Sequence, residues 1–212
     1  NPKDSLLSAA KSRINYAKKQ STDQSKSDQL GSSKRSDRII LNRIVESELI
    51  DYLYTLNNIK IEFVKREFAK DARYGKGLCS DFNLFEDKSQ IIKKLEADLK
   101  EISKKALEKK EIIFVDSFFN IFTSGSGATP HNHIVPLDEN FGLKLHKYSL
   151  VYYLEIGDQS GQDPGILKLY NPDKNILPVN GMIVIIDAKQ FHSVSYSGNK
   201  DRVMIGVNFY GF

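Results

Sequence analysis

The chain has few of the cysteines and none of the long apolar runs that are typical of secreted and membrane-embedded proteins. It contains one cysteine, Cys79, no tryptophan and two methionines among 212 residues. A single cysteine excludes an internal disulfide framework and is typical of a reducing compartment, so we expect a cytoplasmic protein. No apolar run approaches the roughly 20 residues that span a bilayer, and no secretory signal pattern opens the chain. The first residue is Asn rather than Met, which indicates a piece of a longer protein.

Positive charge is also scarce outside the N-terminal segment. The whole chain has a formal net charge of +4. Residues 1–40 contain nine Lys and Arg and four Asp, an excess of five positive charges, which leaves the remaining residues at −1. A nearly neutral body offers no basic face for phosphates, so we expect no nucleic-acid partner.

The basic N-terminal segment reads as an appendage of the folded domain. Residues 5–19 place apolar side chains at helical spacing with lysines and an arginine on the other face. Residues 20–38 are rich in Ser, Asp, Lys and Gln, which predicts a flexible linker. We therefore expect residues 1–38 to be a helix and linker, with the helix packing on its own domain or docking to a partner. Residues 39–212 would form the domain itself.

The first part of that domain, residues 39–110, is predicted to be mostly helical support. The pattern favours a strand over 39–45, a helix over 46–58, a strand over 59–68 and a polar loop through Gly75 and Gly77. Asp87 and Gln90 form a capping-box pattern that opens a long helix ending near 109. The expected buried stripe of this helix is Ile91, Ile92, Leu95, Leu99, Ile102 and Ala106.

The second part, residues 111–212, is predicted to contain only short strands. Apolar and β-branched runs at 112–122, 149–156, 165–170, 182–187, 191–196 and 202–212 are separated by Gly, Pro, Asn and Asp. Helices followed by short antiparallel strands are typical of an α+β domain with a sandwich or jelly-roll barrel.

Three of the four histidines have a spacing that suits a metal ion. His131 and His133 follow a Ser- and Gly-rich turn, and residues two apart on an extended segment project from the same face. His192 comes after several short strands and could return as a third ligand, whereas His146 lies among lysines and reads as a surface residue. Imidazoles alone suit Fe(II), Mn, Zn or Cu. Arg202 follows His192 at a hairpin's distance, with a planar fork suited to a carboxylate.

The order of these segments resembles the double-stranded β-helix (jelly-roll) core of the 2-oxoglutarate/Fe(II)-dependent oxygenases, particularly the prolyl-4-hydroxylase-like branch. The resemblance rests on FFNIFTSGSGATPHNH, YSLVYYLE, GILKLYNP, LPVNGMIVIIDAKQFHSV and DRVMIGVNF occurring in that order. Segments 39–58 and 88–109 resemble the support helices of that family.

The resemblance implies an Fe(II) dioxygenase that uses 2-oxoglutarate and O₂ to hydroxylate an unknown small molecule or protein side chain. His131 would be the first metal ligand, His192 the distal one, and Arg202 would bind the C5 carboxylate of 2-oxoglutarate. His133 occupies the position where the family has Asp or Glu, so the metal ligands would all be histidines.

Two further departures bear on this implied site. The family's Arg-x-Ser reads Arg202-Val-Met here, so a hydroxyl is missing, and Tyr153 and Asn208 are candidates to replace it. Asp138 or Glu139 could replace the missing acid, although same-face geometry favours His133.

Two alternative functions stay open at the level of sequence. One is a catalytically degenerate metal-binding or interaction domain, suggested by the histidine at the acid position. The other is a cupin, because Gly125, His131 and His133 fit the opening of its first motif and Asp138 has the spacing of its acid. The cupin reading gives Arg202 no role. The adjacent letters HNH do not indicate a nuclease, since that motif's residues are dispersed and the body is not basic.

Overall fold

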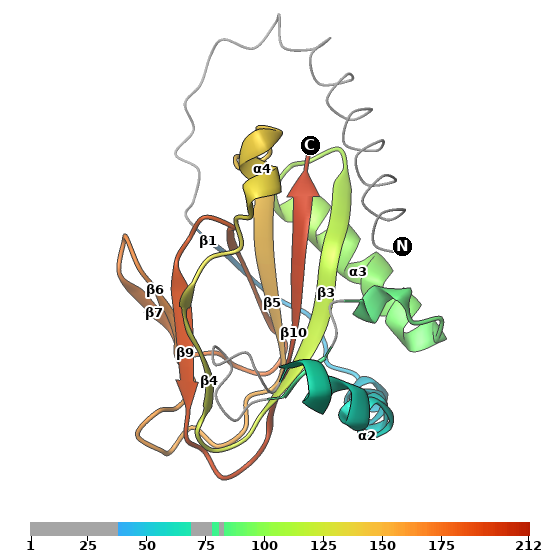
Figure 1. Cartoon of the computed structure of the whole chain (residues 1–212), viewed down its shortest axis with the longest axis vertical. Helices are drawn as coiled ribbons and strands as arrows, with labels where there is room; N and C mark the ends of the chain where they lie inside the picture. Colours follow the sequence, from blue (N-terminus) through green and yellow to red (C-terminus); the bar gives the residue numbers. More distant parts are fainter. Residues whose placement is uncertain (1–37, 69–77, 81–82) are drawn as a thin grey trace, which may run out of the picture.

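The computed structural model describes residues 38–68, 78–80 and 83–212, and it forms two antiparallel sheets (Figure 1). The larger sheet has the strand order β1 (Arg38–Asn42), β8 (Met182–Asp187), β5 (Lys147–Glu155), β10 (Arg202–Gly211), β3 (Ile112–Phe122) and β2 (Leu78–Cys79). The smaller sheet has the order β4 (Ser126–His131), β9 (His192–Tyr196), β6 (Leu167–Leu169) and β7 (Lys174–Ile176). From β3 onward the chain passes repeatedly from one sheet to the other.

The strands of the larger sheet divide their side chains between two cores, as the two-residue period of a strand requires. On β10, Val203, Ile205 and Val207 join the cluster that also contains the helical residues Leu95 and Leu99. Met204, which points to the other face, joins a second cluster built from both sheets. The space between the sheets is therefore a separate core, and it is the one that contains the candidate site.

Two long helices, α2 (Ser47–Phe68) and α3 (Gln90–Ala106), cover the outer face of the larger sheet (Figure 1). The predicted stripe of α3 is confirmed. Ile92, Leu95 and Leu99 are buried, and Ile91, Ile102 and Ala106 are half-buried against the same cluster. A short helix, α4 (Pro136–Asn140), lies at one end of the sheets, and a 3-10 turn spans Leu84–Glu86.

The prediction of a strand over 59–68 is wrong, because α2 continues through Phe68. No glycine or proline interrupts residues 47–68, so nothing ends the helix after Asn58. Extending an existing helix fixes one residue per hydrogen bond gained, whereas a new strand there would need a turn and a partner. The alternation of Ile59, Ile61 and Phe63 was too short to indicate a strand.

The predicted capping box at Asp87 and Gln90 is also wrong. The N-cap of α3 is Ser89, and the Asp87 carboxylate instead accepts hydrogen bonds from the Ser89 N–H at 2.8 Å and the Tyr52 O–H at 3.1 Å. Asp87 therefore joins the start of α3 to α2.

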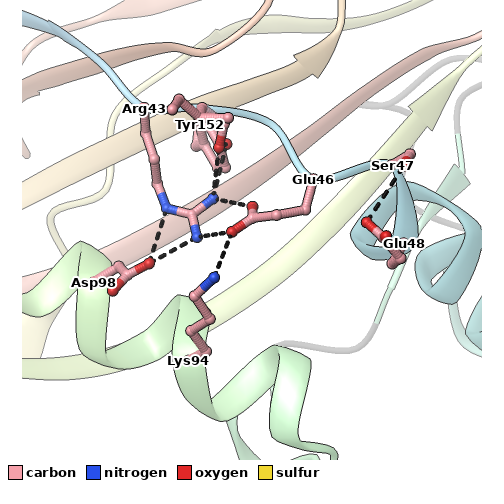
Figure 2. Close-up of polar contacts among 8 residues, drawn as sticks. Arg43, Glu46, Ser47, Glu48, Lys94, Asp98 and Tyr152 are labelled. Carbon is pink, nitrogen blue, oxygen red and sulfur yellow. Dashed lines mark hydrogen bonds and ion pairs between the residues drawn. The ribbon is translucent and has the colours of Figure 1, made fainter.

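Arg43 ties the connection between β1 and α2 to α3 and the larger sheet (Figure 2). Its guanidinium donates to Glu46 at 2.6 Å, to Asp98 at 2.7 Å and to the Tyr152 hydroxyl at 3.0 Å. Burial lowers the pKa of Arg43, but these carboxylates outweigh it and raise the pKa above its ordinary value. Burial likewise raises the pKa of Glu46, and the bonds from Arg43 and Lys94 outweigh it and lower the pKa to about 2.

The predicted helix at 5–19, the linker at 20–38 apart from Arg38, and the loop through Gly75 and Gly77 lie outside the described residues. Within the described part of the chain, no helix is both long enough and apolar enough to cross a membrane.

Candidate metal centre

Two neighbouring strands bring His131, His133 and His192 together. β4 ends at His131 and β9 begins at His192, and the two residues are direct partners in the antiparallel pairing. His133 lies two residues beyond the strand, where its backbone N–H donates to the Ala188 carbonyl at 2.8 Å. One ligand atom from each ring lies within 4.8 Å of the other two. Among the described residues, these three histidines form the group that could hold a metal ion.

The backbone orients the histidine rings toward a shared point. The Nδ1 atom of His131 is 2.6 Å from the Thr129 carbonyl oxygen, and Nδ1 of His192 is 3.0 Å from that of Gln190. A ring nitrogen that faces a carbonyl oxygen carries the proton, which leaves the Nε2 lone pairs for a metal. Nε2 of His133 and Nε2 of His192 are 3.2 Å apart. Ligands at normal metal–nitrogen distances are about 3.0–3.4 Å apart, so this spacing fits a metal ion.

Burial keeps His192 in the form that binds metals. Removal from water, opposed by a hydrogen bond to the Gln190 backbone and assisted by the nearby His131, lowers the pKa of His192 to about 4. The imidazole is therefore neutral near pH 7.

The suggestion that Asp138 or Glu139 replaces the missing acid is wrong. Asp138 is fully buried and accepts from Lys147 at 2.8 Å, from the Val135 N–H at 2.8 Å and from the Tyr210 hydroxyl. Glu139 is exposed and its carboxylate lies 3.4 Å from the Lys144 ammonium. Neither belongs to the group of potential metal ligands. Asp138 instead anchors α4 to β5 and β10 through Lys147 and Tyr210.

Arg202 is a buried cation between the two sheets. Its guanidinium carbon lies 5.0 Å from the centre of the Tyr153 ring and 5.9 Å from that of Tyr196. Nη1 donates to the Gly165 carbonyl, and a side chain at Gly165 (φ +79°) would collide with the guanidinium. Among the described residues, Nε and Nη2 have no hydrogen-bond partner. Burial lowers the pKa of Arg202, and the two tyrosines oppose that shift.

The two residues predicted to assist Arg202 lie in different places. Tyr153 is fully buried against the guanidinium, and burial raises the pKa of its phenol, which stays a hydrogen-bond donor. Asn208 lies further along β10 and donates from Nδ2 to Asp116 at 3.2 Å. Asp116 was missed from the sequence. The available signal was three polar residues, Asp116, Ser117 and Asn120, in the otherwise apolar run of β3.

A cavity of about 570 Å³ opens beside the histidines. The histidines do not line it, but their chain neighbours Asn132, Gln190 and Phe191 do. The remaining lining mixes apolar residues with polar and charged ones of both signs: Ile134, Val135, Pro136, Glu139, Lys144, Tyr170, Asn171 and Lys189. This opening therefore adjoins the segments that carry the metal ligands.

Solved structures resemble this chain, although no protein-family model and no curated protein matches its sequence. A prolyl-4-hydroxylase from Pseudomonas putida is 14% identical with a TM-score of 0.58, over 83% of this chain and 93% of that one. A prolyl hydroxylase from Trichoplax adhaerens, in complex with a peptide fragment of hypoxia inducible factor, is 16% identical with a TM-score of 0.60, over 83% and 84%. A 2OG-Fe(II) oxygenase family member from Burkholderia pseudomallei is 12% identical with a TM-score of 0.54, over 84% and 86%.

The chain has the fold of the 2OG-Fe(II) oxygenases. The resemblance drawn from the order of sequence segments is confirmed at the level of this oxygenase fold. The structure adds that the three histidines meet, and that Arg202 is buried with unpaired N–H groups.

Proposed function

We propose that this chain is a non-haem Fe(II), 2-oxoglutarate-dependent dioxygenase with a double-stranded β-helix core. The observation that carries the proposal is the buried Arg202 guanidinium, whose Nε and Nη2 make no hydrogen bond of normal geometry among the described residues and whose neighbours include no carboxylate, only the Tyr153 and Tyr196 phenols. An unpaired buried cation is costly unless an anion binds to it, and a planar guanidinium fits a carboxylate with two hydrogen bonds. Three imidazoles in the same domain supply the metal site that such a co-substrate needs.

The residues present fit this cofactor and co-substrate. Nε2 atoms of His131, His133 and His192 would hold the metal, and a site with three protein ligands leaves positions open for other molecules. When bound, Fe(II) with 2-oxoglutarate and O₂ would supply the oxidising chemistry that hydroxylates a substrate C–H bond.

The chain's own contribution is to bind, orient and exclude water. Arg202 would bind the C5 carboxylate of 2-oxoglutarate, and the adjacent Tyr153 phenol would donate in place of the missing serine hydroxyl. The role of Asn208 as a second co-substrate ligand stays a prediction, and it would require Nδ2 to leave Asp116. Because Arg202 and Tyr153 are buried, water would compete little for the bound carboxylate.

His133 gives the metal site a different charge from a site with a carboxylate ligand. Three neutral ligands leave the full charge of a divalent ion on the site, which weakens retention of the metal and strengthens attraction for an anionic co-substrate. We propose that the metal and 2-oxoglutarate bind cooperatively for this reason.

The substrate is proposed to approach through the cavity beside the histidines, and it can be a small molecule or a protein side chain. One structural neighbour binds a peptide fragment. Attachment of a partner through residues 1–38 stays a prediction.

The second candidate is a metal-binding domain without catalysis, which the histidine in place of the acid favours. The cupin alternative lacks an acidic metal ligand, since Asp138 is bonded to Lys147 and Tyr210.

Purified protein supplied with Fe(II), ascorbate and O₂ should convert 2-oxoglutarate to succinate, and the Arg202→Ala variant should not. Metal-loaded protein that neither binds 2-oxoglutarate nor forms succinate would support the non-catalytic domain instead.

A further inference from the structure

Asp116 and Asn208 form a polar pair on the side of the larger sheet that faces the smaller one. Asn208 lies on the β10 face of Met204, opposite the face of Val203, Ile205 and Val207 that packs on the helices. Asp116 is the direct partner of Asn208 on β3. The pair therefore belongs to the space between the sheets, as Arg202 does.

This pair lies at the same end of the sheets as the histidines. His133 is bonded through its backbone to Ala188, and Ala188 is bonded to Lys147 at the start of β5. Lys147 is the strand partner of Tyr210, two residues beyond Asn208. Figure 1 shows β10 running toward the α4 end, where β9, the strand that begins with His192, also starts.

The pair leaves one buried acceptor, the Asn208 amide oxygen, without a donor among the described residues. Asn208 is only 5% exposed, and its Oδ1 has no partner among the described residues. Its Nδ2 donates to Asp116, and the reversed amide would set an oxygen against that carboxylate, so the orientation is fixed. The buried cation at the adjoining end of β5, Lys147, is bonded at 2.8 Å to Asp138. No ion pair of Asp116 occurs in the described part of the chain.

We propose that Asp116, oriented by Asn208, binds a cationic group of the substrate, either an ammonium or a guanidinium. A half-buried carboxylate beside a free amide oxygen presents two acceptors to one ligand, and a cation with several N–H donors satisfies both at once. A neutral ligand would leave the carboxylate without a counter-charge. This proposal rests on the proposed function for the metal and co-substrate, and it adds the chemical class of the substrate.

The test compares cations with neutral molecules of the same shape. Zinc-loaded protein with N-oxalylglycine is titrated calorimetrically with L-arginine and L-lysine, and with L-citrulline and L-norleucine. The wild type should bind the cations at least about tenfold more tightly than the neutral partners, a ratio of the size expected for one ion pair. The Asp116→Asn variant should lose this preference. Glu111→Gln removes an exposed charge just before the same strand and should keep it.

A second variant tests the proposal independently in case Asp116→Asn does not fold. Asn208→Leu keeps the carboxylate and removes its orienting amide, so it should weaken arginine binding and reduce the preference. Equal affinity for arginine and citrulline, no binding of any of the four, or an unchanged preference in Asp116→Asn would each overturn the proposal. The proposed function is judged separately, by the absorption band of Fe(II)–2-oxoglutarate, which Asp116→Asn should retain. Cation preference without that band would mean that the proposed function fails.

Discussion

Replacing Arg202 by methionine should leave the ligand-free protein about as stable as the wild type and abolish its response to 2-oxoglutarate. The unpaired Nε and Nη2 each cost about 1–3 kcal/mol when buried. Losing the bond to Gly165 costs about 1.5–3 kcal/mol in the other direction, and each tyrosine contact contributes about 0.5–2 kcal/mol. These effects nearly cancel, so we expect a change within about 2 kcal/mol.

The ligand response of the same variant is expected to be large. At a co-substrate concentration of about 100 times Kd, binding stabilises the wild type by about 2.7 kcal/mol. Removing one partner of a buried charge pair weakens binding by about 100-fold or more, which leaves about 0.4 kcal/mol of stabilisation. Urea unfolding of zinc-loaded protein with and without N-oxalylglycine measures both quantities.

Arg43→Met is the matched control, because Arg43 is also a buried arginine but its partners are present (Figure 2). It should lose about 1.5–3 kcal/mol, the range for charge-assisted hydrogen bonds, and keep the full ligand response. An Arg202→Met variant that destabilises the ligand-free protein more than Arg43→Met does, or that keeps the ligand response, would refute the proposed role of Arg202.

Three further predictions concern other parts of the molecule. His192→Ala should weaken zinc binding at least about tenfold, measured by competition with a chelating dye, and His146→Ala should not weaken it. Equal effects of the two substitutions would show that the three histidines do not form the metal site. Asp138→Asn leaves the buried Lys147 without its counter-charge and should lower the free energy of unfolding in urea by about 3–5 kcal/mol. A loss below about 1 kcal/mol would show that this ion pair does not anchor α4. Glu46 has a pKa lowered to about 2, so its contribution is complete above about pH 4.5 and is lost as the pH falls toward 2. The stability difference between wild type and Glu46→Gln should therefore shrink over that interval, and a difference that stays constant down to pH 2 contradicts the lowered pKa.

Much of the strand pattern could be predicted because it depends on local alternation. The run 112–122 and the run 182–187 match β3 and β8 residue for residue. β4 has almost no apolar side chains, and β7 is three residues long, so both exist only through pairing with β9 and β6. Such strands leave no periodic signal in the sequence.

Part of the candidate site could likewise be predicted from the sequence, and part could not. His131, His133 and His192 could be proposed from spacing, since extended geometry places two of them on one face. The partners of buried charges could not be predicted, because tertiary packing chooses them. Asp138 has the spacing of a metal ligand and is instead bonded to Lys147. Asp116 has no motif around it, and only the register of β3 against β10 sets it beside Asn208.

The most direct test of the central claim is an anaerobic titration of the Fe(II)-loaded protein with 2-oxoglutarate, followed by visible absorption. A charge-transfer band reports metal and co-substrate bound to each other, so one signal tests the histidines and Arg202 together. We expect a saturable band in the wild type, no band in His192→Ala, and a band in Arg202→Met only at co-substrate concentrations about 100-fold higher. Wild-type protein that binds Fe(II) but gives no band at any concentration of 2-oxoglutarate would contradict it.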